Sequence, residues 1–229
     1  EHREESDRMQ LLNGNWKFRY FESIYQVQDA FYLEGYDTSS FDEIPVPGVW
    51  QMYDYGRHQY TNIRYPFPFD PPYIPQDIPC GTYVHDFEYQ KVRNAPRVFL
   101  NFEGVDSCFY VWLNGTYVGY SQVAHATSEF DVTSYLKEGK NTIAVLVLKW
   151  CDGSYLEDQD KFRMSGIFRD VYLLKRPEKA VRDYRIATRL EGERAYITLE
   201  LSFTQPTELE VSVEDRYGAA VAEGNTAQN

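Results

Sequence analysis

The chain has 229 residues, of which 43% are apolar and 17% aromatic, and it carries a net charge of −12. This length allows one large domain or two smaller ones, with ample apolar surface for a buried core. The acidic balance, without any basic run, excludes nucleic acid and anionic membrane surfaces as favoured partners.

The cysteine content argues for a reducing environment. The three cysteines, Cys80, Cys108 and Cys151, cannot form a closed set of disulfides, and their spacing matches no zinc motif. We therefore expect reduced thiols and a cytoplasmic location. The sequence contains no signal peptide and no apolar run long enough to span a bilayer, so no membrane association is expected.

The first third of the chain is largely irregular. Residues 1–9 form a charged leader, and residues 15–20 (NWKFRY) alternate aromatic and polar side chains as a half-buried strand does. Five prolines lie between Pro66 and Pro75, which excludes a helix there. Such a segment must lie over a surface, held in place by its aromatic side chains.

Strand patterns then follow one another closely. They cover residues 82–89, 97–103, 108–113, 116–120, 128–136, 142–150 and 170–174. The Asn114-Gly115 pair between two of these patterns is a strong hairpin signal, because both residues tolerate positive φ. A turn is expected at residues 139–141. Many short strands with hardly any helical pattern predict an all-β sandwich.

A second series of strands begins after Pro177, at residues 181–189, 195–203 and 209–214. Three or four strands are fewer than the seven or so of an immunoglobulin-type sandwich. We therefore expect a first domain over residues 10–177 and an incomplete immunoglobulin-like β-sandwich over residues 178–229.

The longest break between strand patterns, residues 150–170, is the candidate functional edge of the first domain. It is too polar for a core strand and too aromatic for disorder. Glu157, Asp158 and Asp160 could together offer oxygen ligands to a hard cation such as Na⁺, Mg²⁺ or Ca²⁺. Ion pairing with the neighbouring basic residues or a solvated turn explains the same carboxylates.

Other motifs each allow a structural interpretation beside a functional one. His85 lies in a strand and is interpreted as a core histidine, whereas His58 is open to either interpretation. Asn114-Gly115-Thr116 matches the glycosylation pattern, although the hairpin explains it equally well. The aromatic loop at residues 50–75 has the composition of a sugar site, and aromatics that pin a proline-rich segment to the sandwich explain the same residues.

Four segments resemble the N-terminal part of the large bacterial β-galactosidases of glycoside hydrolase family 2. These are VPGVWQM at 46–52, YTN at 60–62 followed by YP at 65–66, DGSYLEDQD at 152–160 and RMSGIFRD at 163–170. The resemblance covers roughly residues 10–190. It implies a jelly-roll sugar-binding domain, then an immunoglobulin-like sandwich, then a TIM barrel.

In that family the barrel carries the two catalytic glutamates of a retaining mechanism. The resemblance therefore implies that no residue of this chain is a catalytic acid, base or nucleophile. It assigns Asn62 to a hydrogen bond with a galactose hydroxyl, and Asp160 to contacts with both the sugar and a Na⁺ ion. The Mg²⁺ of the family is expected on the barrel.

The resemblance leaves Arg163, Arg169 and Asp170 to hold the loop as structural ion pairs. The implied substrate is a β-galactoside such as lactose, and the implied partners are the chain's own catalytic barrel and further copies in a homo-oligomer. Two other hypotheses remain open, a free-standing carbohydrate-binding module or lectin and a structural sandwich without a ligand.

Overall fold

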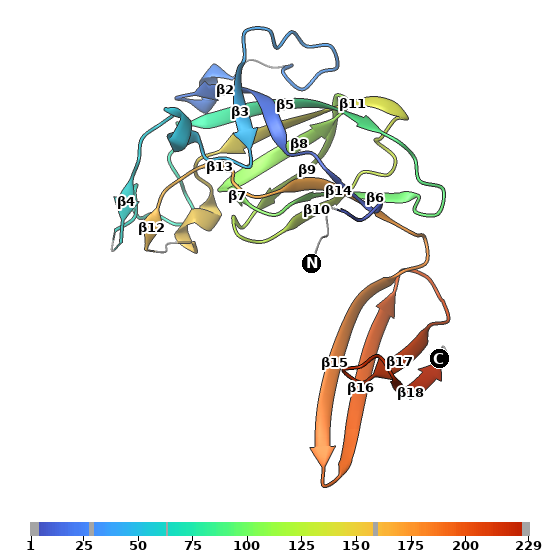
Figure 1. Ribbon diagram of the computed structural model, residues 1–229. Helices are drawn as coiled ribbons and strands as arrows, with labels where there is room; N and C mark the ends of the chain where they lie inside the picture. The colour runs from blue at the N-terminus through green and yellow to red at the C-terminus, as the bar shows by residue number, and fades with distance from the viewer. Residues whose placement is uncertain (1–4, 28–29, 63, 158–159, 226–229) are drawn as a thin grey trace. The chain divides into compact units, whose positions relative to one another are not determined.

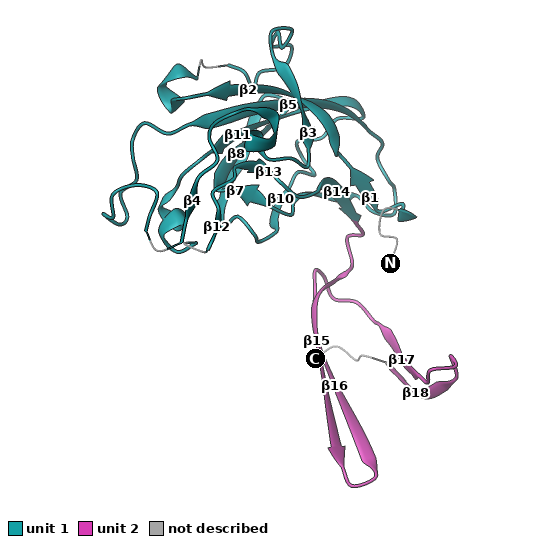
Figure 2. Cartoon of the chain, turned by 60° about the vertical axis from the view of Figure 1, so that its left-hand side comes forward, with its two compact units in different colours: residues 1–175 teal, residues 176–229 magenta. Residues whose placement is uncertain are grey.

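The computed structural model describes residues 5–27, 30–62, 64–157 and 160–225. The chain divides into two compact units, residues 1–175 and residues 176–229 (Figure 2). Both units consist of β-strands, and the short helical turns of the described residues are all of the 3₁₀ type. The predicted all-β fold is therefore confirmed.

Unit 1 is a sandwich of two antiparallel sheets (Figure 1). The larger sheet has six strands, in the order β3 (Asp42–Val46), β2 (Gly14–Phe21), β5 (Cys80–Tyr89), β11 (Gly139–Leu148), β8 (Cys108–Leu113) and β9 (Thr116–Gln122). The smaller has four, in the order β1 (Met9–Leu11), β14 (Val171–Arg176), β6 (Arg97–Phe102) and β10 (Ser128–Asp131).

The core of unit 1 comes from the alternation of side chains along these strands. On β5, Tyr83, Phe87 and Tyr89 share the face that packs into the main core, as their spacing of two predicts. His85 lies on the same face and stacks on the ring of Trp16, with the ring centroids 4.8 Å apart. His85 is half-buried and is not among the buried residues of the main core, so it packs beside the core rather than within it.

The outer face of the larger sheet is also covered. Val84 and Ala144 point away from the main core and form a smaller buried cluster with Phe31 and Phe41. Those two phenylalanines lie between β2 and β3, in the first third of the chain, which the sequence predicts to be largely irregular. This segment contains one 3₁₀ turn, η2 (Ile24–Gln26), so irregular chain covers this face of the sheet.

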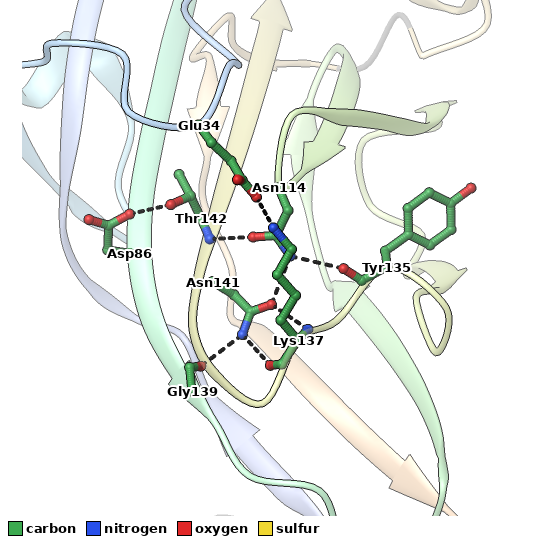
Figure 3. Close-up of polar contacts among 8 residues, drawn as sticks. All are labelled: Glu34, Asp86, Asn114, Tyr135, Lys137, Gly139, Asn141 and Thr142. Atoms are coloured by element: carbon green, nitrogen blue, oxygen red, sulfur yellow. Dashed lines mark hydrogen bonds and ion pairs between the residues drawn. The ribbon is translucent and has the colours of Figure 1, made fainter.

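The Asn114-Gly115 turn joins β8 to β9 with φ values of 51° and 77°, as the hairpin prediction requires. Figure 3 shows that the Asn114 amide donates to the Tyr135 carbonyl at 2.9 Å and to Asn141 Oδ1 at 2.8 Å. Its Oδ1 accepts from the Thr142 amide at 3.0 Å. These contacts use both amide hydrogens, so Asn114 fixes the end of the hairpin and its role is structural.

The turn predicted at residues 139–141 is wrong. Gly139 begins β11 with φ of 85°, and Lys140 and Asn141 already pair with Glu88 and Phe87 on β5. The glycine supplies the positive φ that redirects the chain, and the ladder starts at that residue rather than after it.

Unit 2 consists of two antiparallel pairs. The longer joins β15 (Val181–Glu191) to β16 (Arg194–Phe203), and the shorter joins β17 (Glu210–Glu214) to β18 (Ala220–Asn225). These strands lie where the sequence placed its second series. No helix among the described residues has the length and apolar character that a membrane span requires.

Candidate sugar site

The candidate site is built on the segment that connects β11 to β14. This segment contains a 3₁₀ turn, η4 (Asp152–Tyr155), and two two-residue strands, β12 (Lys161–Phe162) and β13 (Gly166–Ile167). The turn is closed by a reciprocal cap in which the Cys151 amide donates to Ser154 Oγ at 3.1 Å. Asp158, one of the three predicted carboxylates, lies outside the described residues, as does Gln159.

A short ladder brings the two predicted sugar-binding residues together. β12 pairs antiparallel with β4 (Tyr60–Thr61), so that Lys161 lies opposite Thr61 and Phe162 opposite Tyr60. Continuing this register by one residue places Asp160 opposite Asn62. Residues almost a hundred positions apart in the sequence therefore meet at one end of unit 1, where both views show β4 beside β12 (Figures 1 and 2).

The side chains at this point are exposed and polar. Tyr60 Oη donates to Asp160 Oδ1 at 2.5 Å, and this hydrogen bond raises the pKa of Tyr60. The Tyr60 ring lies 5.5 Å from the ring of Phe162. An amide, a carboxylate and an aromatic pair thus occupy one small surface, which is the chemistry that binds sugar hydroxyls and C–H faces.

The donor set for a cation at this site is small. Asp160 has one carboxylate oxygen engaged by Tyr60, and its other oxygen has no partner among the described residues. Within the same residues, no three His, Cys, Asp or Glu side chains cluster as a metal site does. Asp160 offers one carboxylate oxygen to a hard alkali cation, which would need further oxygen ligands.

The residues predicted to hold the loop are engaged in different ways. Arg163 is buried and donates from Nη1 to the Glu157 carbonyl at 3.2 Å. Arg169 donates to the His125 carbonyl at 3.3 Å, and Asp170 accepts from the Asn13 amide at 2.9 Å. The Arg163 contact lies within the loop, whereas those of Arg169 and Asp170 attach the loop to other segments of unit 1.

Glu157 is also structural. Its Oε1 accepts from the backbone amide of Ala124 at 2.7 Å, which ties the loop to the chain after β9. This hydrogen bond gives Glu157 a structural role, as the sequence predicts for the acids beside Asp160. His58, whose role was left open, is exposed and lies two residues before β4.

Tyr155 anchors the proline-rich segment that precedes β5. Its hydroxyl donates to the Tyr73 carbonyl at 2.6 Å and accepts from the Asp70 amide at 3.2 Å. Its ring packs edge-on against Phe67 and Phe69 at 5.3 and 5.6 Å. These contacts support the interpretation that aromatic side chains pin the proline-rich segment to unit 1, and the interpretation of the loop as a sugar site stays a prediction.

The three cysteines are buried free thiols. Burial raises the pKa of Cys80 to about 12. A hydrogen bond from Cys108, together with those from Ser107 and Ser154, lowers the pKa of Cys151 to about 6. Cys151 caps η4 and so belongs to the structural base of the loop.

The sequence did not predict an ion pair beneath the ladder, between Lys161 and Asp106. Lys161 Nζ lies 3.2 Å from Asp106 Oδ2, and both side chains are mostly buried. Burial raises the pKa of the Asp106 carboxyl, and the Lys161 ammonium opposes that shift. No local pattern relates the two residues, because 55 positions separate them.

Comparison with known proteins identifies the class to which this fold and site belong. The model of the glycosyl hydrolase family 2 sugar binding domain matches residues 9–177. The chain belongs to this family.

Two curated relatives are named β-galactosidase. That of Actinobacillus pleuropneumoniae is 50% identical over 222 residues, covering 96% of this chain and 22% of the relative. That of Staphylococcus xylosus is 50% identical over 183 residues, covering 80% and 18%. The chain therefore spans about a fifth of the length of these relatives.

Solved structures share the fold at low sequence identity. A β-glucuronidase from Ruminococcus gnavus superposes with a TM-score of 0.73 and 20% identity, over 95% of this chain and 38% of that one. A β-glucuronidase from an uncultured Clostridium species gives 0.69 and 21%, over 97% and 39%.

Proposed function

We propose that this chain supplies one wall of the galactose pocket of a family 2 β-galactosidase, which hydrolyses terminal β-D-galactose residues with retention. The observation that carries the proposal is the β4–β12 ladder, which pairs Thr61 with Lys161, the direct neighbours of Asn62 and Asp160. The two relatives at 50% identity, both named β-galactosidase, support the choice of galactoside among the sugars of the family.

In this proposal the chain binds and orients, and the catalytic acid/base and nucleophile lie on a TIM barrel elsewhere in the enzyme. The Asn62 amide both donates to and accepts from a sugar hydroxyl. The Asp160 carboxylate accepts from a second hydroxyl and is one ligand of a Na⁺ ion, with the other ligands and the Mg²⁺ site on the barrel. Lactose is the expected kind of substrate, and the full enzyme is expected to be a homo-oligomer.

Binding by the chain alone separates this proposal from that of a free-standing carbohydrate-binding module. Titration calorimetry of the chain with galactose, with lactose and with Na⁺ is expected to give no measurable heat of binding. One or two hydrogen bonds at an exposed wall do not offset the free-energy cost of association. Clear sugar binding that is lost in Asn62→Ala would instead identify an independent lectin-like module.

Kinetics of the full-length enzyme test the role of Asp160. Asp160→Asn is expected to lower kcat/KM for a galactoside by roughly 10- to 150-fold, the loss of one hydrogen bond to a charged group. It should also weaken the dependence of the rate on Na⁺. The matched control is Asp77→Asn, which neutralises an exposed carboxylate that follows the proline-rich run. Equal rates and Na⁺ dependence in Asp160→Asn and Asp77→Asn would refute the assignment.

A further inference from the structure

The ladder that presents Asn62 and Asp160 is too short to hold itself. β4 and β12 have two residues each, and the Arg163 amide adds a third rung by donating to the Gln59 carbonyl at 2.8 Å. Even a longer isolated two-stranded hairpin is only marginally stable in water. The position of Asp160 must therefore depend on contacts that join this ladder to the rest of unit 1.

The alternation of side chains shows where those contacts are. Asp160 and Phe162 lie on the same exposed face, together with Tyr60, which contacts both. Successive residues of a strand point to opposite faces, so Lys161 and its partner Thr61 turn inward. The burial agrees, because the Lys161 side chain is 23% exposed and Thr61 Oγ1 is fully buried.

The inward face meets the carboxylate of Asp106, whose side chain is 17% exposed. Asp106 belongs to β7 (Val105–Asp106), and its backbone pairs with Gly166 of β13. The same residue therefore contacts the site loop twice, by its backbone at Gly166 and by its side chain at Lys161. The backbone of Asp106 holds the β13 segment, and its side chain holds the β4–β12 ladder from the inward face.

We propose that the Lys161–Asp106 ion pair is the positioning element that holds Asp160 opposite Asn62. Neither residue touches the sugar in this scheme, and both act through Asp160. The consequence for sugar binding rests on the function proposed above, whereas the positioning itself is a property of the chain and is measured without sugar.

The physical reason is the burial of both groups. Removing Lys161 takes from the mostly buried Asp106 its hydrogen-bonded cation and the largest favourable charge acting on it, so the carboxyl moves towards water or loses its charge. Since Lys161 lies between Asp160 and Phe162 on a three-rung ladder, a shift of its side chain loosens both neighbours. An exposed ion pair has no such leverage, because water replaces the lost partner.

Amide hydrogen exchange at pH 7, followed by NMR on the 229-residue chain, tests the proposal. Lys161→Met is expected to speed exchange of the Arg163 amide on the order of tenfold while amides of β11 keep their rates, because the opening is local. Ring contacts between Tyr60 and Phe162 should weaken in the same sample. Lys161→Arg keeps the charge and is expected to retain the protection.

The matched control is Lys140→Met, which removes an exposed ion pair with Asp86 at 2.8 Å elsewhere in unit 1. It should leave the Arg163 amide unchanged. Asp106→Asn is the second variant if Lys161→Met does not fold, because it is isosteric and leaves a lysine that can still reach water. Unchanged Arg163 exchange in folded Lys161→Met or Asp106→Asn would overturn the proposal, as would equal acceleration of the β11 amides.

The hydrogen-exchange result and the kinetic test of the proposed function can succeed or fail independently. Local loosening of the ladder would support the positioning role even if the full-length enzyme proved indifferent to Asp160→Asn. Conversely, a rigid ladder in Lys161→Met would show that the ion pair does not position Asp160, and it would leave the proposed sugar contacts of Asn62 and Asp160 untouched.

Discussion

Side chains alternate along the strands of both units, but the apolar face that results is buried in unit 1 and exposed in unit 2. In unit 1, the inward faces of two sheets meet and bury residues such as Ile143 and Val145 completely. In unit 2, β15 and β16 align Tyr184, Ile186 and Leu190 on one face, while Arg185 and Arg189 lie on the other. That apolar face is open among the described residues, where Ile186 is 58% exposed.

The difference shows what a strand pattern does and does not determine. A period of two fixes which side chains share a face of a sheet. It does not fix whether a second layer covers that face, and burial, rather than strand formation, provides most of the stabilisation. We therefore expect equal substitutions in the two units to have unequal effects on stability.

The largest contrast is expected from the same substitution at two isoleucines. Ile143→Ala removes a fully buried side chain and should lower the free energy of unfolding of unit 1 by about 2–5 kcal/mol. Ile186→Ala truncates an exposed side chain and should change the free energy of opening of the β15–β16 pair by less than about 0.5 kcal/mol. Urea unfolding followed by tryptophan fluorescence measures the first variant, because all four tryptophans lie within residues 16–150, and amide exchange at Ile197, on the strand paired with β15, measures the second.

Comparable losses in both variants would mean that the apolar face of β15–β16 is covered in solution. The two units would then not differ in how well their apolar faces are buried. A loss confined to Ile143→Ala would agree with an apolar face on β15–β16 that stays open to water.

A second contrast concerns two glycines within strands. A Cβ at Gly81 would lie 2.5 Å from Phe18 Cε2 and 2.9 Å from Trp50 Cζ2, both rings being buried. Gly81→Ala should therefore destabilise unit 1 by about 1–3 kcal/mol through overpacking. A Cβ at Gly224 meets nothing within 4 Å. Gly224→Ala should be neutral or stabilise β18 by up to about 1 kcal/mol.

The urea midpoint of unit 1 measures the first variant, and amide exchange at Val213, on the strand paired with β18, measures the second. A Gly81→Ala variant as stable as the parent would show that the two rings move apart at little cost. The close packing around β5 would then not be the source of its stability.

Sequence reasoning located most strands of both units because alternation is a local signal. The Asn114-Gly115 hairpin was predictable for the same reason, since two adjacent residues determine its turn. β4 and β12 were not predictable, because strands of two residues have no periodicity to detect. The Lys161–Asp106 pair was equally hidden, since only the tertiary fold brings its two members together.

The candidate site shows the same division. Composition suggested an aromatic sugar surface, and family resemblance singled out Asn62 and Asp160, but neither indicated that one short ladder sets these residues opposite each other. Tyr60, the hydrogen-bond partner of Asp160, was overlooked because one tyrosine among 20 carries no signal in the sequence. The roles of Asn62 and Asp160 towards sugar and Na⁺ remain predictions.

The smallest expected effect is a pH dependence confined to unit 1. Burial against Trp16 lowers the pKa of His85 below its ordinary value of 6.5, with a weaker opposing effect of Asp86. The unfolded chain therefore binds a proton more readily than the folded one. Stability should fall as the pH decreases from about 7 through 6.5, and this contribution should level off below the lowered pKa of the folded state.

Replacing the titrating ring isolates this contribution from those of the carboxylates. His85→Phe keeps an aromatic ring to stack on Trp16 and cannot take up a proton, so its urea midpoint should change less between pH 7.5 and pH 5.5 than that of the parent chain. His58→Phe makes the same substitution at an exposed position before β4 and should preserve the parent's dependence. If the parent, His85→Phe and His58→Phe show parallel pH profiles, then His85 binds a proton equally well in the folded and the unfolded chain. The stacked ring on β5 would then be as accessible to solvent as the open strands of unit 2.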